Sequence, residues 1–369
     1  MKSRKEKILL ILHLPPPVHG AAMMGAYLHQ SQLLHDSFDC RFVNLTTASS
    51  LEDIGKASFT KIVSFINLLK EVRREVKSFR PDVVYVTPNS CAPAFYKDFL
   101  LVVMLKLMGG HLVAHYHNKG VATRQNRKFD HLLYHFFFKN LKVILLSDKL
   151  YPDVAKYVNT DSVFICSNGI PHSDKNIERE EKNTPRILFL SNLIESKGVY
   201  LLLDALQILP QRDLLFECDF VGGETKEISS FSFQQEIEKR QLKDNVAYHG
   251  SRVGDEKKSF YDNADIFVFP TYSDCFPLVL LEAMQHGLPC ISTDEGAIPS
   301  IVDDGRTGFI VEKKNPQQLA DRIQQLLSNA DLRLSMGMAG RQKFEKEYTL
   351  SVFENRMVEI FKDVLSERK

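Results

Sequence analysis

Two carboxylates, Asp274 and Glu282, lie eight positions apart around the predicted start of a helix. Residues 266–269, Ile-Phe-Val-Phe, are a short apolar run typical of a buried strand, and a helical pattern follows over residues 277–286. The polar residues between the two elements can form a turn or cap the helix. Glu282 would lie on the flank of this helix, and Asp274 would lie in the loop before it.

The start of this helix is a predicted anion site. Pro277 suits a first helical turn, where its missing N–H costs little. The free N–H groups near Phe276 and Leu278, together with the helix dipole, attract a phosphate group. Two acids beside a phosphate suggest recognition of hydroxyls, with a sugar hydroxyl at one acid and a ribose hydroxyl at the other. The alternative is an ordinary helix with an N-cap aspartate, Asp274, and a surface glutamate, Glu282.

A lysine occupies another place suited to phosphate. Residues 186–190 form a predicted buried strand, residues 191–198 form a polar loop, and a helix follows to about residue 209. Lys197 stands at the start of that helix. Because a cation is unfavourable at the positive end of a helix, a ligand-binding role explains Lys197 better than a surface role does.

Two glycine-containing loops follow predicted strands. The strand over residues 8–14 leads into a proline-rich loop that contains Gly20, and a predicted helix from Met23 to about His35 follows. The strand over residues 216–221 ends at Gly222. Such loops lie at the carboxyl ends of strands, where α/β sheets bind ligands. For Gly20, a rigid tight turn without a ligand is the alternative.

Length and composition fit two domains. The 369 residues include 44% hydrophobic residues, which is enough for two cores. The net charge of +1 gives no excess suited to nucleic acid, but residues 1–167 carry +9 and residues 168–369 carry −8. The basic half suits an anionic surface or acceptor, and compositional drift is the alternative. Six scattered cysteines without a C-x-x-C motif indicate a reduced, cytosolic protein.

Residues 59–79 form a predicted amphipathic helix. Its apolar residues recur at helical spacing: Ile62, Ile66, Leu69, Val72 and Val76. Four cations are expected on another face: Lys70, Arg73, Arg74 and Lys77. A solvated face is the simpler interpretation of these cations, and contact with anionic lipid is the alternative. No stretch of the sequence is predicted to cross a bilayer.

The segment Asp274-Cys-Phe-Pro-Leu-Val-Leu-Leu-Glu282 resembles the E-x7-E signature of the family 4 retaining glycosyltransferases (glycosyl transferases group 1), with Asp in place of the first Glu. Lys197-Gly198 and Asn168-Gly169 resemble two further motifs of this family and stand in the same order. The resemblance implies the GT-B fold, an α/β architecture of two Rossmann-like parallel-sheet domains that face each other across a cleft.

The resemblance also implies a division of the chain. Residues 1–167 would form an acceptor-binding domain, and residues 186–346 would form a domain that binds a nucleotide sugar. Residues 168–185 would link them. A C-terminal helix over about residues 347–369 would cross back to the first domain.

Individual residues gain expected roles from the same resemblance. His117, which follows a predicted strand over residues 112–116, would face the transferred sugar. Asn192 stands where the family has an arginine, and together with Lys197 it would bind the donor diphosphate. Val253 lies in the loop that would hold the nucleotide base.

His115 lies on the same side of the predicted strand as His117, and either could be an ordinary core or surface histidine. His117 is the favoured functional residue of the two. The expected catalytic residues are therefore His117, Lys197 and Asp274. The expected donor-binding residues are Gly20, Asn192, Lys197, Gly222, Val253, Asp274, Phe276, Pro277, Leu278 and Glu282.

A retaining transferase of this kind implies no protein nucleophile, because the leaving diphosphate can take the proton of the acceptor hydroxyl on the same face. The protein must then stabilise the charge that grows on the diphosphate. No cofactor and no obligatory metal are expected, and the sequence contains no Asp-x-Asp motif. It also lacks the phosphate-binding signatures of P-loop kinases and of dehydrogenases.

The expected function is transfer of a sugar from a nucleotide-diphospho-sugar to a carbohydrate or lipid-linked acceptor in cell-surface polysaccharide or glycolipid assembly. UDP-sugars are favoured as donors over GDP-sugars, and no nucleic acid is expected as a partner. The expected location is the cytoplasm, with a peripheral position at an anionic membrane surface on its inner face. The alternatives are a non-catalytic nucleotide-sugar-binding subunit and a GT-B epimerase or phosphorylase.

Overall fold

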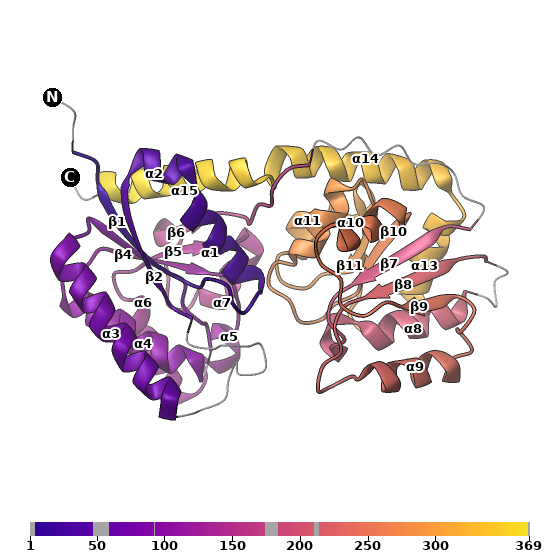
Figure 1. Ribbon diagram of the computed structural model, residues 1–369, viewed down its shortest axis with the longest axis horizontal. Coiled ribbons are helices and arrows are strands. Elements are labelled where there is room, and N and C mark those ends of the chain that lie inside the picture. Colours follow the sequence, from indigo (N-terminus) through magenta and orange to yellow (C-terminus); the bar gives the residue numbers. More distant parts are fainter. Residues whose placement is uncertain (1–3, 47–58, 92, 174–183, 210–213, 368–369) are drawn as a thin grey trace. The chain divides into compact units, whose positions relative to one another are not determined.

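A computed structural model describes residues 4–46, 59–91, 93–173, 184–209 and 214–367 (Figure 1). The chain divides into two compact units. Unit 1 comprises Met1–Gly169 and Leu350–Lys369, and unit 2 comprises Ile170–Thr349. Most of the linker that was expected over residues 168–185 lies outside the described residues.

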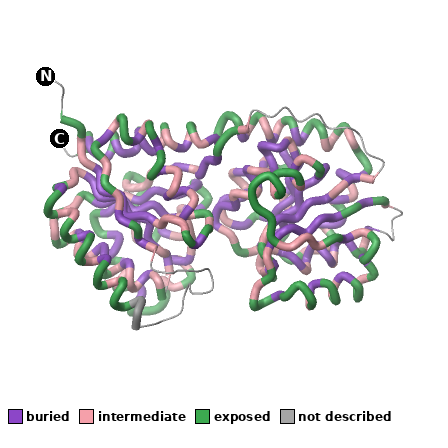
Figure 2. Tube along the Cα trace, in the orientation of Figure 1, coloured by how far each residue is buried: buried purple, intermediate pink, exposed green. Residues whose placement is uncertain are grey.

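Unit 1 is built on a six-stranded parallel sheet with the order β2-β1-β3-β4-β5-β6. The strands are β1 Lys7–Leu12, β2 Asp39–Asn44, β3 Val83–Val86, β4 Leu112–Tyr116, β5 Lys142–Leu145 and β6 Val163–Ile165. The central strands are continuous apolar runs that are buried along nearly their whole length (Figure 2), as expected for a parallel sheet covered on both faces.

Helices cover both faces of this sheet. They are α1 Gly20–Gln30, α2 Gln32–Ser37, α3 Phe59–Phe79, α4 Ala94–Leu107, α5 Val121–Arg124, α6 Lys128–Phe138, α7 Tyr151–Val154 and α15 Leu350–Ser366. α3 contacts α4, and α4 contacts α6, so these three form one layer. α15, from the end of the chain, packs on α2 and β3, where Phe361 contacts the rings of Phe38 and Tyr85.

Unit 2 is built on a second six-stranded parallel sheet, with the order β12-β11-β10-β7-β8-β9. Its strands are β7 Arg186–Leu190, β8 Glu217–Val221, β9 Val246–Tyr248, β10 Ile266–Phe269, β11 Cys290–Thr293 and β12 Gly308–Val311. Its helices are α8 Val199–Ile208, α9 Ser230–Lys239, α10 Gly254–Asn263, α11 Leu278–Gln285, α12 Ile298–Ile301, α13 Pro316–Leu327 and α14 Ala330–Glu347. The expected α/β architecture of two Rossmann-like parallel sheets is confirmed.

Each sheet contains a point where the strand order reverses. In unit 1 it lies between β1 and β3, and in unit 2 between β7 and β10. Successive crossovers on the two sides of such a point go to opposite faces of the sheet, which leaves a crevice at the carboxyl ends of the two strands. The loops after β7 and β10 carry Lys197 and Asp274, so the topology brings these two candidates together.

Two helix predictions were wrong in detail. The helix expected from Met23 to about His35 begins at Gly20 and is broken at Ser31. It begins early because the His19 side chain accepts the N–H of Ala22 and caps the first turn. It breaks because Ser31 adopts an extended backbone and caps the next helix through Leu34 N–H.

The apolar pattern of α3 was also partly misassigned. The helix spans residues 59–79 as expected, but Ile62 and Ile66 are 57% and 46% exposed. The buried side of α3 is formed instead by Leu68, Val72 and Phe79. At about 100° per residue, Leu68, Val72 and Phe79 fall within about 40° of one another around the helix, whereas Ile62 and Ile66 lie roughly 80–160° away from them.

Candidate active site

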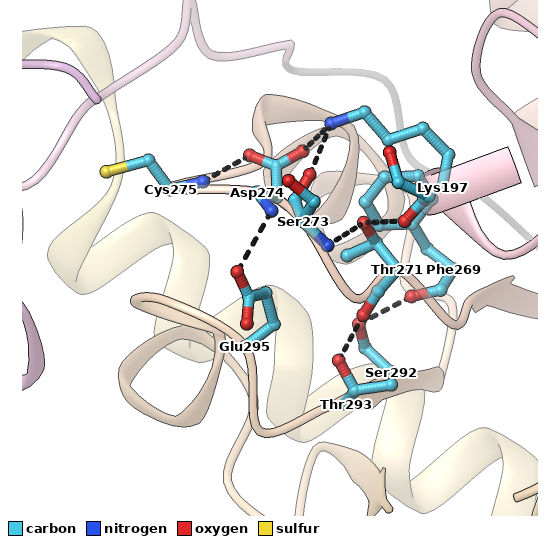
Figure 3. Close-up of polar contacts among 10 residues, drawn as sticks. Lys197, Phe269, Thr271, Ser273, Asp274, Cys275, Ser292, Thr293 and Glu295 are labelled. Atoms are coloured by element: carbon cyan, nitrogen blue, oxygen red, sulfur yellow. Dashed lines mark hydrogen bonds and ion pairs between the residues drawn. The ribbon is translucent and has the colours of Figure 1, made fainter. Parts of the chain in front are cut away.

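An ion pair joins the loops that follow β7 and β10 (Figure 3). The Nζ atom of Lys197 lies 2.6 Å from Oδ2 of Asp274 and donates a second hydrogen bond to the carbonyl of Ser273 at 3.0 Å. The two charged side chains are only 22% and 18% exposed, so water screens their attraction weakly. Lys197 is therefore fixed at the crevice between the two strands.

Backbone contacts hold these two loops at close range. Gly198, next to Lys197, has φ +86°, and a Cβ atom there would lie 2.4 Å from the carbonyl oxygen of Pro270. Only glycine fits this combination of left-handed backbone and close approach. The carbonyl of Ser196 accepts hydrogen bonds from Tyr272 N–H at 2.9 Å and from the Thr271 hydroxyl at 3.0 Å. Lys197 thus projects from a rigid turn.

Asp274 is held at three points. Besides the bond to Lys197, its Oδ1 atom accepts the N–H of Cys275 at 2.8 Å, and its own N–H donates to Oε1 of Glu295 at 3.3 Å. Glu295 in turn pairs with Lys313 at 2.7 Å. Asp274 therefore caps its own loop and not α11, so the alternative interpretation of Asp274 as the N-cap of that helix is wrong.

The start of α11 lies directly after this loop. Phe276 and Pro277 are buried, and Leu278 is half-buried. Pro277 is the N-cap residue with an extended backbone, one position before the first turn in which it was expected. The first backbone N–H groups of a helix have no partner within the helix, and here no side chain caps them. This end of α11 retains donors and a positive dipole beside Lys197 and Asp274.

Glu282 occupies the flank of α11 and is already engaged. Its Oε1 atom lies 2.6 Å from Nζ of Lys257, and its Oε2 atom accepts the Tyr261 hydroxyl at 2.7 Å. Burial, followed by the charge of Glu282, raises the pKa of Tyr261 well above its ordinary value. The phenol therefore stays protonated and fixes the carboxylate as an acceptor.

A second pair of loops carries two more candidates. The Oδ1 atom of Asn192 accepts the N–H of Gly223 at 3.1 Å, which ties the loop after β7 to the loop after β8. The N–H of Gly222 donates to the carbonyl of Gly250 at 2.8 Å, which ties in the loop after β9. A Cβ atom on Gly222, at φ +155°, would lie 1.8 Å from the carbonyl oxygen of Ser191. Asn192 retains its amide N–H₂ as a donor.

Val253 lies three residues beyond Gly250, as the N-cap of α10, and is 77% exposed. An exposed valine at the carboxyl edge of the sheet offers an apolar surface for a planar ring. Five predicted donor contacts thus lie on loops that are hydrogen-bonded to one another: those of Asn192, Lys197, Gly222, Val253 and Asp274.

The remaining candidates, His117 and Gly20, belong to unit 1. His117 follows β4, and Gly20 is the exposed first residue of α1. Burial lowers the pKa of His117 to about 4, nearby His19 adds to this shift, and a hydrogen bond with Asn168 opposes it. His117 is therefore a neutral imidazole near pH 7, close to His19 and the start of α1.

His115 is completely buried on the same side of β4, with its ring centroid 4.2 Å from that of His117. The Tyr85 hydroxyl lies 2.8 Å from its Nδ1 atom. Burial lowers the pKa of His115 well below its ordinary value. The interpretation of His115 as a core histidine agrees with its complete burial.

Sequence reasoning missed several residues that support the candidates. Lys257 and Tyr261, one turn apart on α10, hold Glu282, and Glu295 holds the backbone of Asp274. His13 lies beside His19, with 5.8 Å between their ring centroids, and burial lowers its pKa to about 3. None belongs to a recognisable motif, so only the spatial arrangement could identify them.

Within the described part of the chain, no group of three or more His, Cys, Asp or Glu residues is arranged to hold a metal ion. The six cysteines are free thiols. Among the described residues, no helix is long and apolar enough to span a bilayer.

A family model for glycosyl transferases group 1 matches residues 172–343. The matched segment lies within unit 2 and includes Lys197, Asp274 and Glu282. The chain as a whole is 25% identical, over 93% of its length and 95% of the relative, to an uncharacterized glycosyltransferase of Methanocaldococcus jannaschii. It is also 25% identical to the amylovoran biosynthesis glycosyltransferase AmsK of Erwinia amylovora, over 69% of this chain and 65% of the relative.

Solved structures share the fold. HepE of Anabaena, crystallised in complex with UDP, superposes with a TM-score of 0.74 at 15% sequence identity, over 97% of this chain and all of that one. The expected GT-B fold is confirmed.

Proposed function

We propose that this protein is a group 1 glycosyltransferase, and that it is a retaining, metal-independent enzyme of the family 4 type. It would transfer a sugar from a nucleotide-diphospho-sugar, with UDP-sugars favoured over GDP-sugars, to an acceptor hydroxyl. The observation that carries the proposal is the Lys197–Asp274 pair at the switch point of the unit 2 sheet, beside the start of α11. That is where open α/β sheets bind their ligands.

The donor diphosphate would lie at the N-terminus of α11, within reach of Lys197. As the bond between the sugar carbon and the diphosphate breaks, negative charge grows on the diphosphate. A fixed ammonium group and preorganised N–H groups stabilise that charge more than they stabilise the bound donor, which accelerates the reaction. Positive charge supplied by the protein in this way removes the need for a metal, and the sequence lacks an Asp-x-Asp motif.

The acceptor oxygen would form its bond to the sugar carbon on the face that the diphosphate leaves. The departing diphosphate would accept the proton of the acceptor hydroxyl, so atoms and charge balance without a protein base. The products are the new glycoside and a nucleoside diphosphate. Asp274 would bind a sugar hydroxyl, and Glu282, oriented by Tyr261, would bind the ribose.

Unit 1 would supply the acceptor site and His117. A neutral imidazole can exchange hydrogen bonds with a sugar hydroxyl without adding charge. The pKa of about 4 keeps His117 in that form across the physiological range. We also propose a place in cell-surface polysaccharide or glycolipid assembly, because the relative AmsK is an amylovoran biosynthesis glycosyltransferase. The location would be the cytoplasm, at the inner face of the membrane.

Release of nucleoside diphosphate from a panel of UDP-, GDP- and ADP-sugars, with EDTA present and crude lipid-linked acceptors added, tests the proposal. We expect acceptor-dependent release from one donor and an unchanged anomeric configuration in the product. Inverted product, or activity that requires an added metal, would refute retention or metal independence respectively. Donor binding without release would favour a non-catalytic subunit, and conversion of donor without acceptor would favour an epimerase.

A further inference from the structure

The solvent-facing side of α4 is apolar. Leu100 and Leu107 are 55% and 84% exposed. The three charged groups of this helix do not compensate. Asp98 is buried and pairs with Lys97, whose side chain is only 23% exposed. The Nζ atom of Lys106 donates to three backbone carbonyls near the end of α6. A helix that is apolar all round is normally covered on every side. The outer side of α4 therefore has the composition of an interface.

The neighbouring helix α6 has a similar outer side. Phe129, Leu132 and Phe136 are 63%, 52% and 52% exposed. They stand at positions i, i+3 and i+7, which places them on one stripe of the helix. Single exposed apolar residues are common on soluble proteins, but an aligned aromatic stripe beside a second apolar helix is not.

The two stripes lie next to each other. At one end, the ring of Tyr96 on α4 lies 6.0 Å from that of Phe129 on α6. At the other end, Lys106 of α4 donates to the carbonyls of Phe136 and Phe137 on α6. The helices therefore run side by side in the same direction, and their exposed residues form one continuous surface. We name the surface of Leu100, Leu107, Phe129, Leu132 and Phe136 the α4/α6 face.

Cations stand at both ends of α6, beside the α4/α6 face. Arg127, Lys128 and Lys139 are exposed at the ends of α6. The two acids of these helices are removed from the surface: Asp98 is 1% exposed, and Asp130 is 2% exposed and paired with Arg124. An apolar surface rimmed by positive charge complements the boundary between anionic headgroups and acyl chains.

The adjacent helix α3 continues this pattern. Ile62, Val63 and Ile66 are exposed in its first half, and Figure 2 shows its outer side largely exposed. The predicted stripe of cations follows in its second half, and all four side chains are exposed: Lys70, Arg73, Arg74 and Lys77. Ile62, Ile66, Arg73 and Lys77 fall within about 60° of one another around the helix. The layer of α3, α4 and α6 is thus both apolar and basic.

We propose that the α4/α6 face docks on an anionic lipid bilayer, with its leucine and phenylalanine side chains in the acyl boundary and the flanking cations on the headgroups. A protein partner or a second copy of the chain would be expected to present acids to these cations, and α4 and α6 expose no acid for a symmetric pairing. The docking surface lies within unit 1 and does not rest on the proposed transfer reaction.

Sedimentation with vesicles tests the docking directly. We expect the full-length protein to bind vesicles of phosphatidylglycerol and phosphatidylcholine in equal parts, and to bind phosphatidylcholine alone at least tenfold more weakly. Each cation near an anionic surface contributes about fivefold to the partition coefficient. The double substitution Lys128→Gln and Lys139→Gln should therefore lower binding roughly 30-fold. Lys239→Gln on α9, with an exposed side chain in unit 2, is the matched control and should bind normally.

The apolar contribution is tested separately. Leu132→Gln and Phe136→Gln should each lower binding roughly tenfold, because each removes apolar area from the acyl boundary. Phe231→Gln changes a still more exposed phenylalanine, on α9 in unit 2, and should leave binding unchanged. All these positions are exposed, so we expect melting temperatures to stay close to that of the unchanged protein.

Three results would overturn the proposal. The first is equal binding to neutral and anionic vesicles, and the second is equal binding of the substituted and unchanged proteins. The third is a protein that is dimeric in size-exclusion chromatography and becomes monomeric on Phe136→Gln. The third result would assign the α4/α6 face to contact between copies of the chain.

Discussion

The Nζ atom of Lys197 lies 2.6 Å from Oδ2 of Asp274, although 77 residues separate them in the sequence. The pairing follows from the strand order, because β7 and β10 are neighbours and their loops share one crevice. The same loop contacts place both residues beside the start of α11. This arrangement makes Asp274 a residue that positions Lys197 as well as a candidate sugar contact.

Asp274→Asn should release Lys197 from its ion pair while retaining an acceptor for the N–H of Cys275. Since a charge-assisted hydrogen bond contributes about 1.5–3 kcal/mol, we expect kcat/KM for the donor to fall roughly 10- to 100-fold. Steady-state kinetics of nucleoside diphosphate release give kcat/KM for the two proteins. Asp255→Asn, at a fully exposed side chain on α10, is the control. Unchanged kcat/KM in Asp274→Asn would show that the ion pair has no role in turnover.

Gly198→Ala should destabilise the loop that carries Lys197. The position combines φ +86° with a Cβ clash at 2.4 Å against Pro270, and strained backbone of this kind costs about 1–3 kcal/mol. Gly305→Ala is a matched control, because Gly305 has φ +76° and a Cβ atom added there would have no atom within 4 Å. We expect a clearly larger drop in melting temperature for Gly198→Ala. Equal drops would mean that only the dihedral angle matters and that the loops can separate at no cost.

Tyr261→Phe should free one oxygen of Glu282 from its hydrogen bond. The carboxylate would then be held only by its ion pair with Lys257 and could rotate. Because a hydrogen bond contributes roughly 1 kcal/mol, we expect KM for the donor to rise about fivefold. We expect little change in kcat. Tyr151→Phe, which removes a hydroxyl bond to a backbone carbonyl in unit 1, is the control. A kcat change at constant KM would contradict the assignment of Glu282 to donor binding.

Acid should destabilise the protein through its buried histidines. The folded-state pKa values of His117 and His13, about 4 and about 3, lie below the ordinary value of 6.5. As pH falls below 6.5, these two histidines become protonated in the unfolded chain but stay neutral in the folded protein. The free energy of unfolding therefore falls by at most about 1.4 kcal/mol per pH unit for each histidine. Well above pH 6.5 these histidines are neutral in both states and do not make stability depend on pH.

Melting temperatures of the unchanged protein and of His13→Asn, measured from pH 7 down to the folded-state pKa of His117 at about 4, check this dependence. The Asn side chain can still contact the Thr46 hydroxyl, which lies 3.4 Å from Nδ1 of His13. We expect a shallower pH dependence in the variant. Parallel curves would indicate that His13 has the same pKa in the folded and the unfolded chain.

Much of the fold was predictable from the sequence because parallel strands are continuous apolar runs that end at turn residues. β4, β7 and β10 have the predicted bounds. The helices were harder to predict. The break at Ser31 depends on a side-chain cap, and the exposure of Ile62 and Ile66 depends on which side of α3 meets the sheet. Hydrophobic spacing alone does not determine either feature.

Less of the candidate site was predictable. The sequence placed Lys197 and Asp274 on loops after strands, but it did not show that the two side chains pair. Nothing in the sequence indicated that Lys257 and Tyr261 hold Glu282, because these contacts join two helices through side chains that no motif fixes. Networks of this kind follow from packing, and packing becomes visible only in three dimensions.

Turnover of Lys197→Ala tests the central claim most directly. The measurement is kcat for acceptor-dependent release of nucleoside diphosphate, in the presence of EDTA, for the unchanged protein and for Lys197→Ala. If Lys197 stabilises the departing diphosphate, kcat should fall roughly 10²-fold or more while the melting temperature stays close to that of the unchanged protein. A folded Lys197→Ala protein with near-normal kcat would contradict the account.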